Sequence, residues 1–225
     1  DLQIVNALRG GAVSVRALTY YDGNVYLGGV FTHLTGGGSS KVYARNAGRV
    51  SLSGRPDRSW NPEISGSVQA VGVSEANSAF YAGGHFTTAH GNQRAWYAAK
   101  FSTQAGAALD AGFSFEPSAP SAGKYQQTIS TAGDRVYIGG SEHSLFGYDA
   151  ASNQRLSGAM MFSNGGDLQA STVSAKGVIY GSCHCSDATY QDMYTWSMNM
   201  SWSRVDEIKW VGAWDAATGK SLKWT

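Results

Sequence analysis

Val25-Tyr26-Leu27-Gly28-Gly29-Val30-Phe31-Thr32 recurs in recognisable form three more times along the chain, and this repetition decides the fold. The later copies are 80–87, 136–141 and 179–184, and the last of them has lost the glycine pair. The tyrosines that the copies share, Tyr26, Tyr81, Tyr137 and Tyr180, are spaced by 55, 56 and 43 residues. The chain is therefore interpreted as an array of four repeats.

Each repeat is predicted to consist of short β-strands, because apolar and polar residues alternate around the repeated stretch. A hairpin turn is expected at Asp22-Gly23, since Asp-Gly favours tight hairpin turns. The expected strands are 13–19, 25–31, 47–52 and 57–62 in the first repeat, 67–73, 79–86 and 96–101 in the second, 125–129, 135–140 and 145–148 in the third, and 169–173, 178–182 and 210–214 in the fourth.

Short strands that recur every ~40 to 50 residues are typical of a β-propeller, in which each repeat forms one blade. A lone sheet with two apolar faces cannot bury both, so blades stack face to face around an axis. The glycine pairs would let the crowded inner strands approach closely. We expect an all-β fold, a β-propeller of four-stranded blades, with blades at approximately 12–65, 66–120, 121–167 and 168–225.

Four blades lie at the low end of the range for propellers, which have ~4 to 8. We therefore expect the chain to be part of a larger ring, with residues 1–9 as the outer strand of a further blade. An open ring exposes blade faces and strand edges. A second copy, or another chain completing the propeller, is the expected partner.

The repeat pattern Tyr-x-Gly-Gly-x-Phe-Thr, followed by a turn and Trp-Asn-Pro, resembles the bacterial secreted β-propeller repeats of the delta-60 type. The residues that carry the resemblance are Tyr26, Gly28, Gly29, Phe31, Thr32, Trp60, Asn61 and Pro62, then Tyr81, Gly83, Gly84, Phe86, Thr87 and Pro117, then Tyr137, Gly139 and Gly140, and finally Tyr180 with Asp215, Thr218 and Gly219. The resemblance implies a secreted or cell-surface scaffold, and it supplies no catalytic motif.

The composition excludes some partners. With 17 basic and 16 acidic residues the net charge is +1, and no basic block is present, so nucleic acid and anionic membranes are not expected partners. No apolar run is long enough to span a bilayer. The low charged fraction, 15%, favours an exported protein, and the first residues lack a signal peptide, as in a mature N-terminus.

Cys183-His184-Cys185 is the most unusual local motif. On an extended strand the two Cα atoms would stand about 6.6 Å apart on one face, which permits a disulfide with local bending. A metal site and a redox pair are the alternatives, although the second ligand pair of a zinc site is missing. A histidine closely follows the Tyr-x-Gly-Gly core, or its counterpart, in each repeat. These residues, His33, His85, His143 and His184, are interpreted as polar loop residues rather than a metal site.

The insertion 187–209 belongs to the fourth repeat alone and is rich in aromatic residues and methionine. Such side chains offer large contact areas to partners or sugar rings. The predicted binding residues are Tyr190, Tyr194, Trp196 and Trp202. The alternative is that the insertion folds back and seals a blade or the central channel.

We expect a non-catalytic, extracellular or cell-surface propeller that binds a glycan or a protein through loops at one rim. No cofactor is expected. Scattered carboxylates such as Asp57, Asp149 and Asp215 are interpreted as turn residues. The alternatives are a carbohydrate-active enzyme with rim carboxylates, for which Glu63 and Glu116 are the residues to replace, and a structural part-ring that assembles with another chain.

Overall fold

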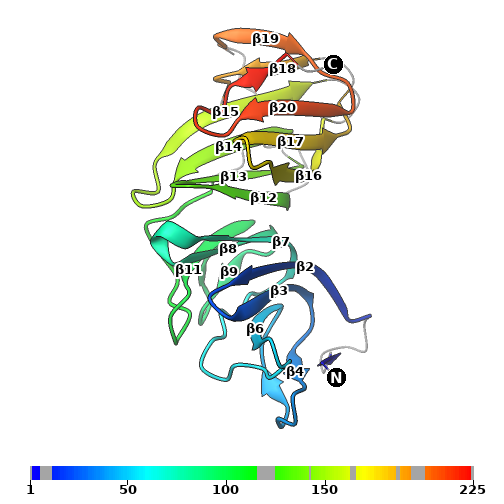
Figure 1. The fold of residues 1–225 in the computed structure, drawn as a ribbon, viewed down its shortest axis with the longest axis vertical. Helices are drawn as coiled ribbons and strands as arrows, with labels where there is room; N and C mark the ends of the chain where they lie inside the picture. The colour runs from blue at the N-terminus through cyan, green and yellow to red at the C-terminus, as the bar shows by residue number, and fades with distance from the viewer. Residues whose placement is uncertain are drawn as a thin grey trace. The chain divides into compact units, whose positions relative to one another are not determined.

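A computed structural model describes residues 2–5, 12–115, 125–141, 143–162, 166–185, 188–193 and 201–223. Strands dominate these residues, and their one helical element is the 3-10 turn η1 (Glu75–Asn77). No helix in the described ranges is long and apolar enough to cross a membrane. The chain divides into two compact units, 1–115 and 116–225, and Figure 1 labels their strands.

Unit 1 contains two antiparallel sheets, here called the first and second blades. The first blade has the order β2-β3-β6 and the second the order β7-β8-β11. Their strands are β2 (Ser14–Tyr21), β3 (Asn24–Val30), β6 (Ala47–Ser51), β7 (Ser67–Ser74), β8 (Ala79–His85) and β11 (Ala98–Ser102). The turn at Asp22 and Gly23 has φ of 47° and 74°, as a type I′ hairpin requires, so this prediction is confirmed.

Two small sheets flank these blades. One has the order β1 (Gln3–Val5), β4 (His33–Thr35), β5 (Val42–Tyr43), and the other pairs β9 (Thr88–Ala89) with β10 (Gln93–Arg94). The N-terminal strand thus pairs with the segment that follows the first glycine pair, rather than forming the outer strand of a further blade. Apolar residues of this small sheet pack with Leu27 of β3, which explains the pairing.

Unit 2 contains the third and fourth blades. The third has six strands in the order β12-β13-β14-β15-β18-β19, and the fourth has the order β16-β17-β20-β21. Their bounds are β12 (Gln126–Ala132), β13 (Arg135–Gly140), β14 (Ser144–Asp149), β15 (Arg155–Phe162), β18 (Ala188–Gln191), β19 (Arg204–Glu207), β16 (Leu168–Val173), β17 (Val178–Cys183), β20 (Val211–Asp215) and β21 (Ser221–Leu222). The insertion 187–209 therefore supplies two strands that fold back onto the third blade.

Aromatic side chains fill the junction between the first and second blades. Trp60 is fully buried and meets Tyr26 and Phe80 edge to face, with ring centroids 5.1 and 5.0 Å apart. The indole Nε1 donates a hydrogen bond to the Ser102 carbonyl at 2.9 Å. Burial of these rings accounts for much of the attraction between the two blades.

The predicted strand at 57–62 is wrong. Only an isolated bridge, Val50 to Pro56, continues the first blade. The Asp57 Oδ1 atom accepts hydrogen bonds at 2.7 Å from both the backbone N–H and the hydroxyl of Ser59, which curls the chain into a turn. Trp60 therefore follows a turn instead of belonging to a strand, and its side chain fills the junction between the first and second blades.

The glycine pairs permit close approach, as predicted, and the two glycines of the first pair make room for different neighbours. A Cβ at Gly28 would lie 2.5 Å from a Val68 methyl on the second blade. A Cβ at Gly29 would overlap the carbonyl oxygen of Ser14 on the adjacent strand. The third blade repeats the first relation, because a Cβ at Gly139 would lie 2.6 Å from Leu168 of the fourth blade. Both first glycines admit the next blade, and Gly139 also admits the Ser144 carbonyl of β14 in its own blade, whereas Gly29 admits the neighbouring strand.

Two of the repeat tyrosines take part in hydrogen bonds at the blade junctions, Tyr26 through Arg49 and Tyr137 directly. Arg49 donates to the Tyr26 hydroxyl at 3.1 Å and to the carbonyl of Thr103 on the second blade, while it pairs with Asp57 at 2.7 Å. In unit 2, the Tyr137 hydroxyl donates to the carbonyl of Ala216 at 2.9 Å. Burial raises the pKa of both tyrosines, so the hydroxyls stay protonated, as the hydrogen bond donated by Tyr137 requires.

The Asp57 carboxylate makes unit 1 sensitive to acid. Burial would raise the pKa of Asp57, but hydrogen bonds from Ser59 and Arg49 outweigh it and hold the pKa below its ordinary value. A carboxyl with a lowered folded-state pKa stabilises above its unfolded pKa, and this stability is lost as pH falls through the folded pKa. We expect urea unfolding from pH 7 to pH 3 to show a loss of about 1 kcal/mol that Asp57→Asn lacks. Equal pH slopes in the two proteins would contradict this role.

Candidate functional site

The hairpin β18–β19 projects from the third blade and has two different faces. β18 pairs with β15, placing Tyr190 opposite Met160, and β19 pairs with β18, placing Val205 opposite Tyr190. Side chains alternate along a strand, so Tyr190 and Val205 share one face while Gln191 and Asp206 share the other. We call these the outer face and the inner face of the hairpin.

Gln191 anchors the inner face to the fourth blade. This buried amide donates through Nε2 to the carbonyls of Gly158 and Gly219, each at 3.2 Å. Its Oε1 accepts a hydrogen bond from the backbone N–H of Ser221 on β21 at 2.9 Å. One side chain thus satisfies backbone groups from β15, from the turn before β21 and from β21 itself.

A charge pair between the exposed Arg204 and the buried Asp206 reinforces this anchor. Arg204 contacts Asp206 at 2.7 Å, and the Asp206 carboxylate also accepts a hydrogen bond from the Ser221 hydroxyl. Arg204 donates in addition to the carbonyl and the hydroxyl oxygen of Ser221. A buried carboxylate requires such compensation. Both strands of the hairpin are therefore fixed to β21, and the described part of the insertion does seal a junction between blades.

The outer face carries an aromatic pair, a half-buried tyrosine and an exposed tryptophan. Tyr190 and Trp202 meet edge to face with ring centroids 5.1 Å apart, and Trp202 is 45% exposed. Val205 beside them is 42% exposed. The structure thus brings together two of the predicted binding residues, whereas Tyr194 and Trp196 lie outside the described residues. Val205 was missed, although its position between charged residues of β19 marks it as an apolar residue on a solvated strand.

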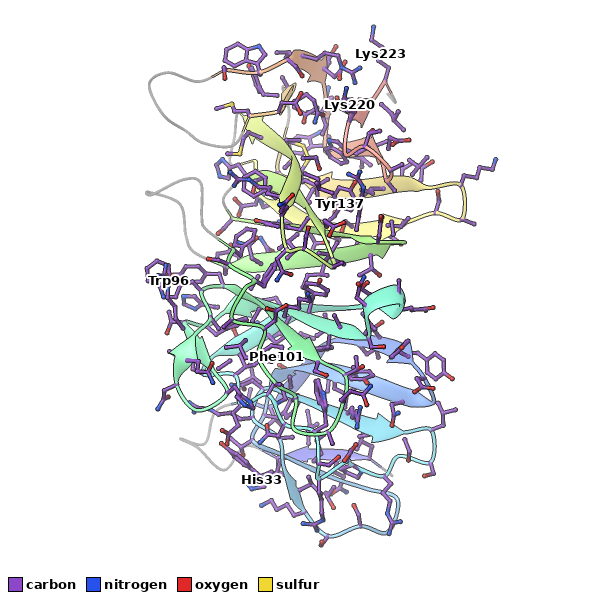
Figure 2. The ribbon with its side chains drawn as sticks, turned by 90° about the vertical axis from the view of Figure 1, so that its left-hand side faces the viewer. His33, Trp96, Phe101, Tyr137, Lys220 and Lys223 are labelled. Atoms are coloured by element: carbon purple, nitrogen blue, oxygen red, sulfur yellow. A yellow bond between two sulfur atoms is a disulfide. The ribbon has the colours of Figure 1, made fainter. Side chains whose placement is uncertain are left out.

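A second exposed aromatic, Trp96, was also missed as a site residue. The predicted strand at 96–101 begins only at Ala98, so Trp96 precedes it and is 43% exposed (Figure 2). The Arg94 guanidinium lies 3.8 Å from the centre of the Trp96 ring. Both residues line a hollow of about 290 Å³ that Phe113 and Phe115 also border. The signal in the sequence is the Arg-x-Trp spacing, which places both side chains on one face of an extended segment.

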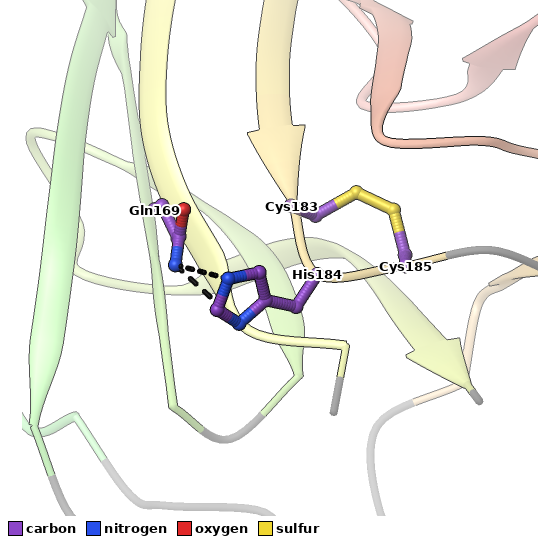
Figure 3. Close-up of a disulfide and its surroundings, with 4 residues drawn as sticks. All are labelled: Gln169, Cys183, His184 and Cys185. Atoms are coloured by element: carbon purple, nitrogen blue, oxygen red, sulfur yellow. Dashed lines mark hydrogen bonds between the residues drawn. A yellow bond between two sulfur atoms is a disulfide. The ribbon is translucent and has the colours of Figure 1, made fainter. Parts of the chain in front are cut away.

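Cys183 and Cys185 are joined by a disulfide with Cα atoms 5.1 Å apart (Figure 3). The spacing is shorter than the extended value because β17 ends at Cys183 and His184 lies in a bend. Hydrogen bonds from Cys183 N–H to the Trp210 carbonyl and from Trp210 N–H to the Cys185 carbonyl hold the bend. The His184 ring turns toward the Gln169 amide, at 2.9 Å.

The other histidines have separate surroundings. His33 contacts the Thr32 hydroxyl at 2.9 Å and the Tyr43 ring, and His143 lies 3.2 Å from Asp167. Burial lowers the pKa of His143, and Asp167 offsets only part of this, so the ring is mainly neutral at pH 7. Within the described ranges, no three His, Cys, Asp or Glu side chains are grouped so that they could hold a metal ion.

Several carboxylates serve turns, as the sequence predicts. The Asp215 Oδ1 accepts hydrogen bonds from Thr218 N–H and from the Thr218 hydroxyl, each at 2.8 Å, and Asp149 has the same relation to Ser152. These hydrogen bonds lower the pKa of both aspartates. Of the pair singled out for an enzymatic alternative, Glu63 has a left-handed backbone at φ 50°, and Glu116 lies outside the described residues.

Known proteins share the arrangement of the strands but not the sequence. No protein-family model and no curated protein matches the chain. The structure of U3-55K resembles it over 98% of its length with a TM-score of 0.56 and 11% identity. The crystal structure of the RRP9 WD40 repeats does so over 98% with a TM-score of 0.55 and 11% identity. The chain spans about two thirds of each, 66% and 67% respectively. The chain is therefore an all-β protein with a β-propeller fold, as predicted.

Proposed function

We propose that the protein is a non-catalytic binding module that holds a partner on the outer face of the β18–β19 hairpin. The observation that carries this proposal is the exposed Trp202 ring, in contact with the half-buried Tyr190 and beside the exposed Val205, on a hairpin whose inner face is fixed by Gln191. An aromatic pair on a rigid support offers contact area with little entropy left to lose on binding. The likeness to WD40 propellers supports a binding scaffold, although a fold alone does not define a function.

The partner we propose is a protein or a glycan met outside the cell. A partly exposed indole packs well against an apolar protein surface or against the face of a sugar ring. The resemblance to delta-60 repeats and the low charged fraction support export and a place at the cell surface. The acidic residues in the turns are engaged as hydrogen-bond acceptors, which fits a structural role rather than acid and base catalysis.

Trp202→Ala tests this function. We expect the variant to lose binding at least tenfold to ligands that the wild-type protein selects from glycan arrays and from arrays of extracellular proteins. Because Trp202 is 45% exposed, we expect its thermal unfolding to match that of the wild type. Trp96→Ala is the matched control, since Trp96 is exposed to a similar degree on unit 1.

Two results would contradict the proposal. The first is that Trp202→Ala binds every selected ligand as well as the wild type does. The second is that it unfolds at a clearly lower temperature, because the indole would then be part of the core. Loss of binding by Trp96→Ala instead would move the site to the hollow beside Arg94.

A further inference from the structure

The first blade carries an exposed row of apolar side chains on β2. Val15, Leu18 and Tyr20 are 39%, 67% and 57% exposed. Leu18 lies opposite Leu27 and Tyr20 opposite Val25, so the row shares a face with the odd-numbered residues of β3. Tyr26 and Gly28 point the other way, toward the second blade. We call Val15, Leu18 and Tyr20 the open face.

The register identifies the residues of the second blade that match the open face. β2 and β7 both have a bulge at the same place, between Val15 and Ala17 and between Val68 and Ala70. Counted from the glycine pair, Val15, Leu18 and Tyr20 occupy the positions of Val68, Val71 and Val73. These three valines are only 0%, 8% and 5% exposed, because the first blade covers them.

The fourth blade shows the same relation again. Leu168 occupies the position of Val68, since it lies opposite Cys183 as Val68 lies opposite Gly84. Leu168 is fully buried against Gly139 of the third blade. In two junctions within this chain, the strand with the Tyr-x-Gly motif thus covers the position of Val68 or Leu168 on the first strand of the next blade. The open face has the same position and the same apolar chemistry.

The fourth blade also has a face that resembles the one with which the first blade covers the second. Tyr180 has the register of Tyr26, since each lies opposite a threonine of the preceding strand, Thr172 and Thr19. Ile179 packs toward the third blade, so Tyr180 and Ser182 face away from it. Ser182 stands at the position where small Gly28 admits Val68. Val211 and Leu222, on the same face, are 38% and 39% exposed.

We propose that the open face of one copy of the chain docks against the Tyr180 face of the fourth blade of a second copy. The contact repeats the mode by which the first blade covers the second. The tyrosine packs on the neighbouring sheet, and the small residue two positions later leaves room for an apolar side chain of that sheet. The two surfaces differ, so the contact is heterologous and links copies head to tail. This surface is separate from the outer face of the hairpin.

Sedimentation velocity over a wide range of protein concentrations tests the contact. We expect concentration-dependent association of the wild-type protein, and Leu18→Asp with Tyr20→Asp should weaken it about 100-fold or more, since docking would bury two unpaired carboxylates. Leu156→Asp is the matched control, because Leu156 on β15 is 41% exposed and lies outside both surfaces. A protein that stays monomeric throughout, or an equal effect of Leu156→Asp, would overturn the proposal.

A photoreactive phenylalanine analogue at position 180 gives a second measurement that does not depend on the aspartate variants folding. Isotope-labelled and unlabelled copies are mixed, irradiated and digested, and cross-linked peptides are identified by mass. We expect cross-links between copies that join position 180 to 15–25. Cross-links to other segments, or only within one copy, would overturn the proposal. Trp202→Ala should leave association unchanged, so the docking contact and the proposed binding function can fail independently.

Discussion

Replacing Trp60 with alanine is expected to lower the free energy of unfolding of unit 1 by about 3 to 5 kcal/mol. Trp60 is fully buried, it meets the rings of Tyr26 and Phe80, and its Nε1 donates to the Ser102 carbonyl. Removing the indole leaves a cavity between the first and second blades and a buried carbonyl without its donor. Urea unfolding followed by circular dichroism measures the loss, with hydrogen exchange of β3 and β8 to locate it.

Trp96→Ala is the control for this variant, because it removes the same side chain from an exposed position. We expect it to change the free energy of unfolding by about 0.5 kcal/mol or less. If Trp60→Ala unfolded at the same urea concentration as Trp96→Ala, the Trp60 indole would not stabilise the junction between the first and second blades.

Replacing Gln191 with leucine is expected to detach the hairpin β18–β19 from the fourth blade. The glutamine bonds to the Gly158 and Gly219 carbonyls and to the Ser221 N–H, and leucine of similar size bonds to none of them. The Gly158 carbonyl keeps the hydrogen bond from the Asp192 N–H, so the loss falls on the Gly219 carbonyl and the Ser221 N–H. A buried group left unsatisfied costs about 1 to 3 kcal/mol, so we expect a loss of about 3 kcal/mol or more in unit 2. Hydrogen exchange should accelerate in β18, β19 and β21 before the rest of the unit.

Gln169→Leu is the matched control for Gln191→Leu. Gln169 is exposed on β16, where its amide bonds to His184, so we expect a small effect on stability. Unchanged protection of β18 in Gln191→Leu would show that the charge pair of Arg204 and Asp206 alone holds the hairpin. Because the hairpin supports Trp202, we also expect Gln191→Leu to weaken binding of the ligands that Trp202→Ala loses.

The strands around the glycine pairs could be predicted from the sequence within one or two residues. β13 (Arg135–Gly140) has the predicted bounds, and β3, β7, β8, β16 and β17 differ from theirs by a residue or so. These strands combine alternation, a turn and the repeated motif, so independent signals agree. Where only an aromatic residue marked a strand, as at 57–62, the prediction was wrong, because the Asp57 side chain stabilises a turn there.

The pairing of distant segments could not be predicted. No strand was predicted at β15 (Arg155–Phe162), and its partner β18 follows the intervening hairpin β16–β17. Pairing between segments that are distant in sequence depends on which strand edge of a sheet is free in the folded protein. The alternation of apolar and polar residues within one segment does not show this. The sheet of β1, β4 and β5 was missed for the same reason.

The site could be predicted in part. Clustered aromatic residues in the insertion pointed to Tyr190 and Trp202, which the structure brings into contact. The anchoring residues Gln191, Arg204 and Asp206 could not be recognised, because polar residues in an expected loop look the same whether they face solvent or bond to the buried Ser221 of β21. Only the strand register separates the outer face of the hairpin from its anchored inner face.

The central claim is that the repeated Tyr-x-Gly-Gly strand of one blade packs directly on the first strand of the next. A double variant, Gly28→Cys with Val68→Cys, tests it, because a Cβ at Gly28 would lie 3.2 Å from the Val68 Cβ, close to the separation in a disulfide. Mass spectrometry of the oxidised, digested protein should find position 28 bonded to position 68. Gly28→Cys with Leu18→Cys, on the opposite face of the first blade, should give no such bond. Free thiols at 28 and 68 in a folded protein would contradict the stacking of the blades.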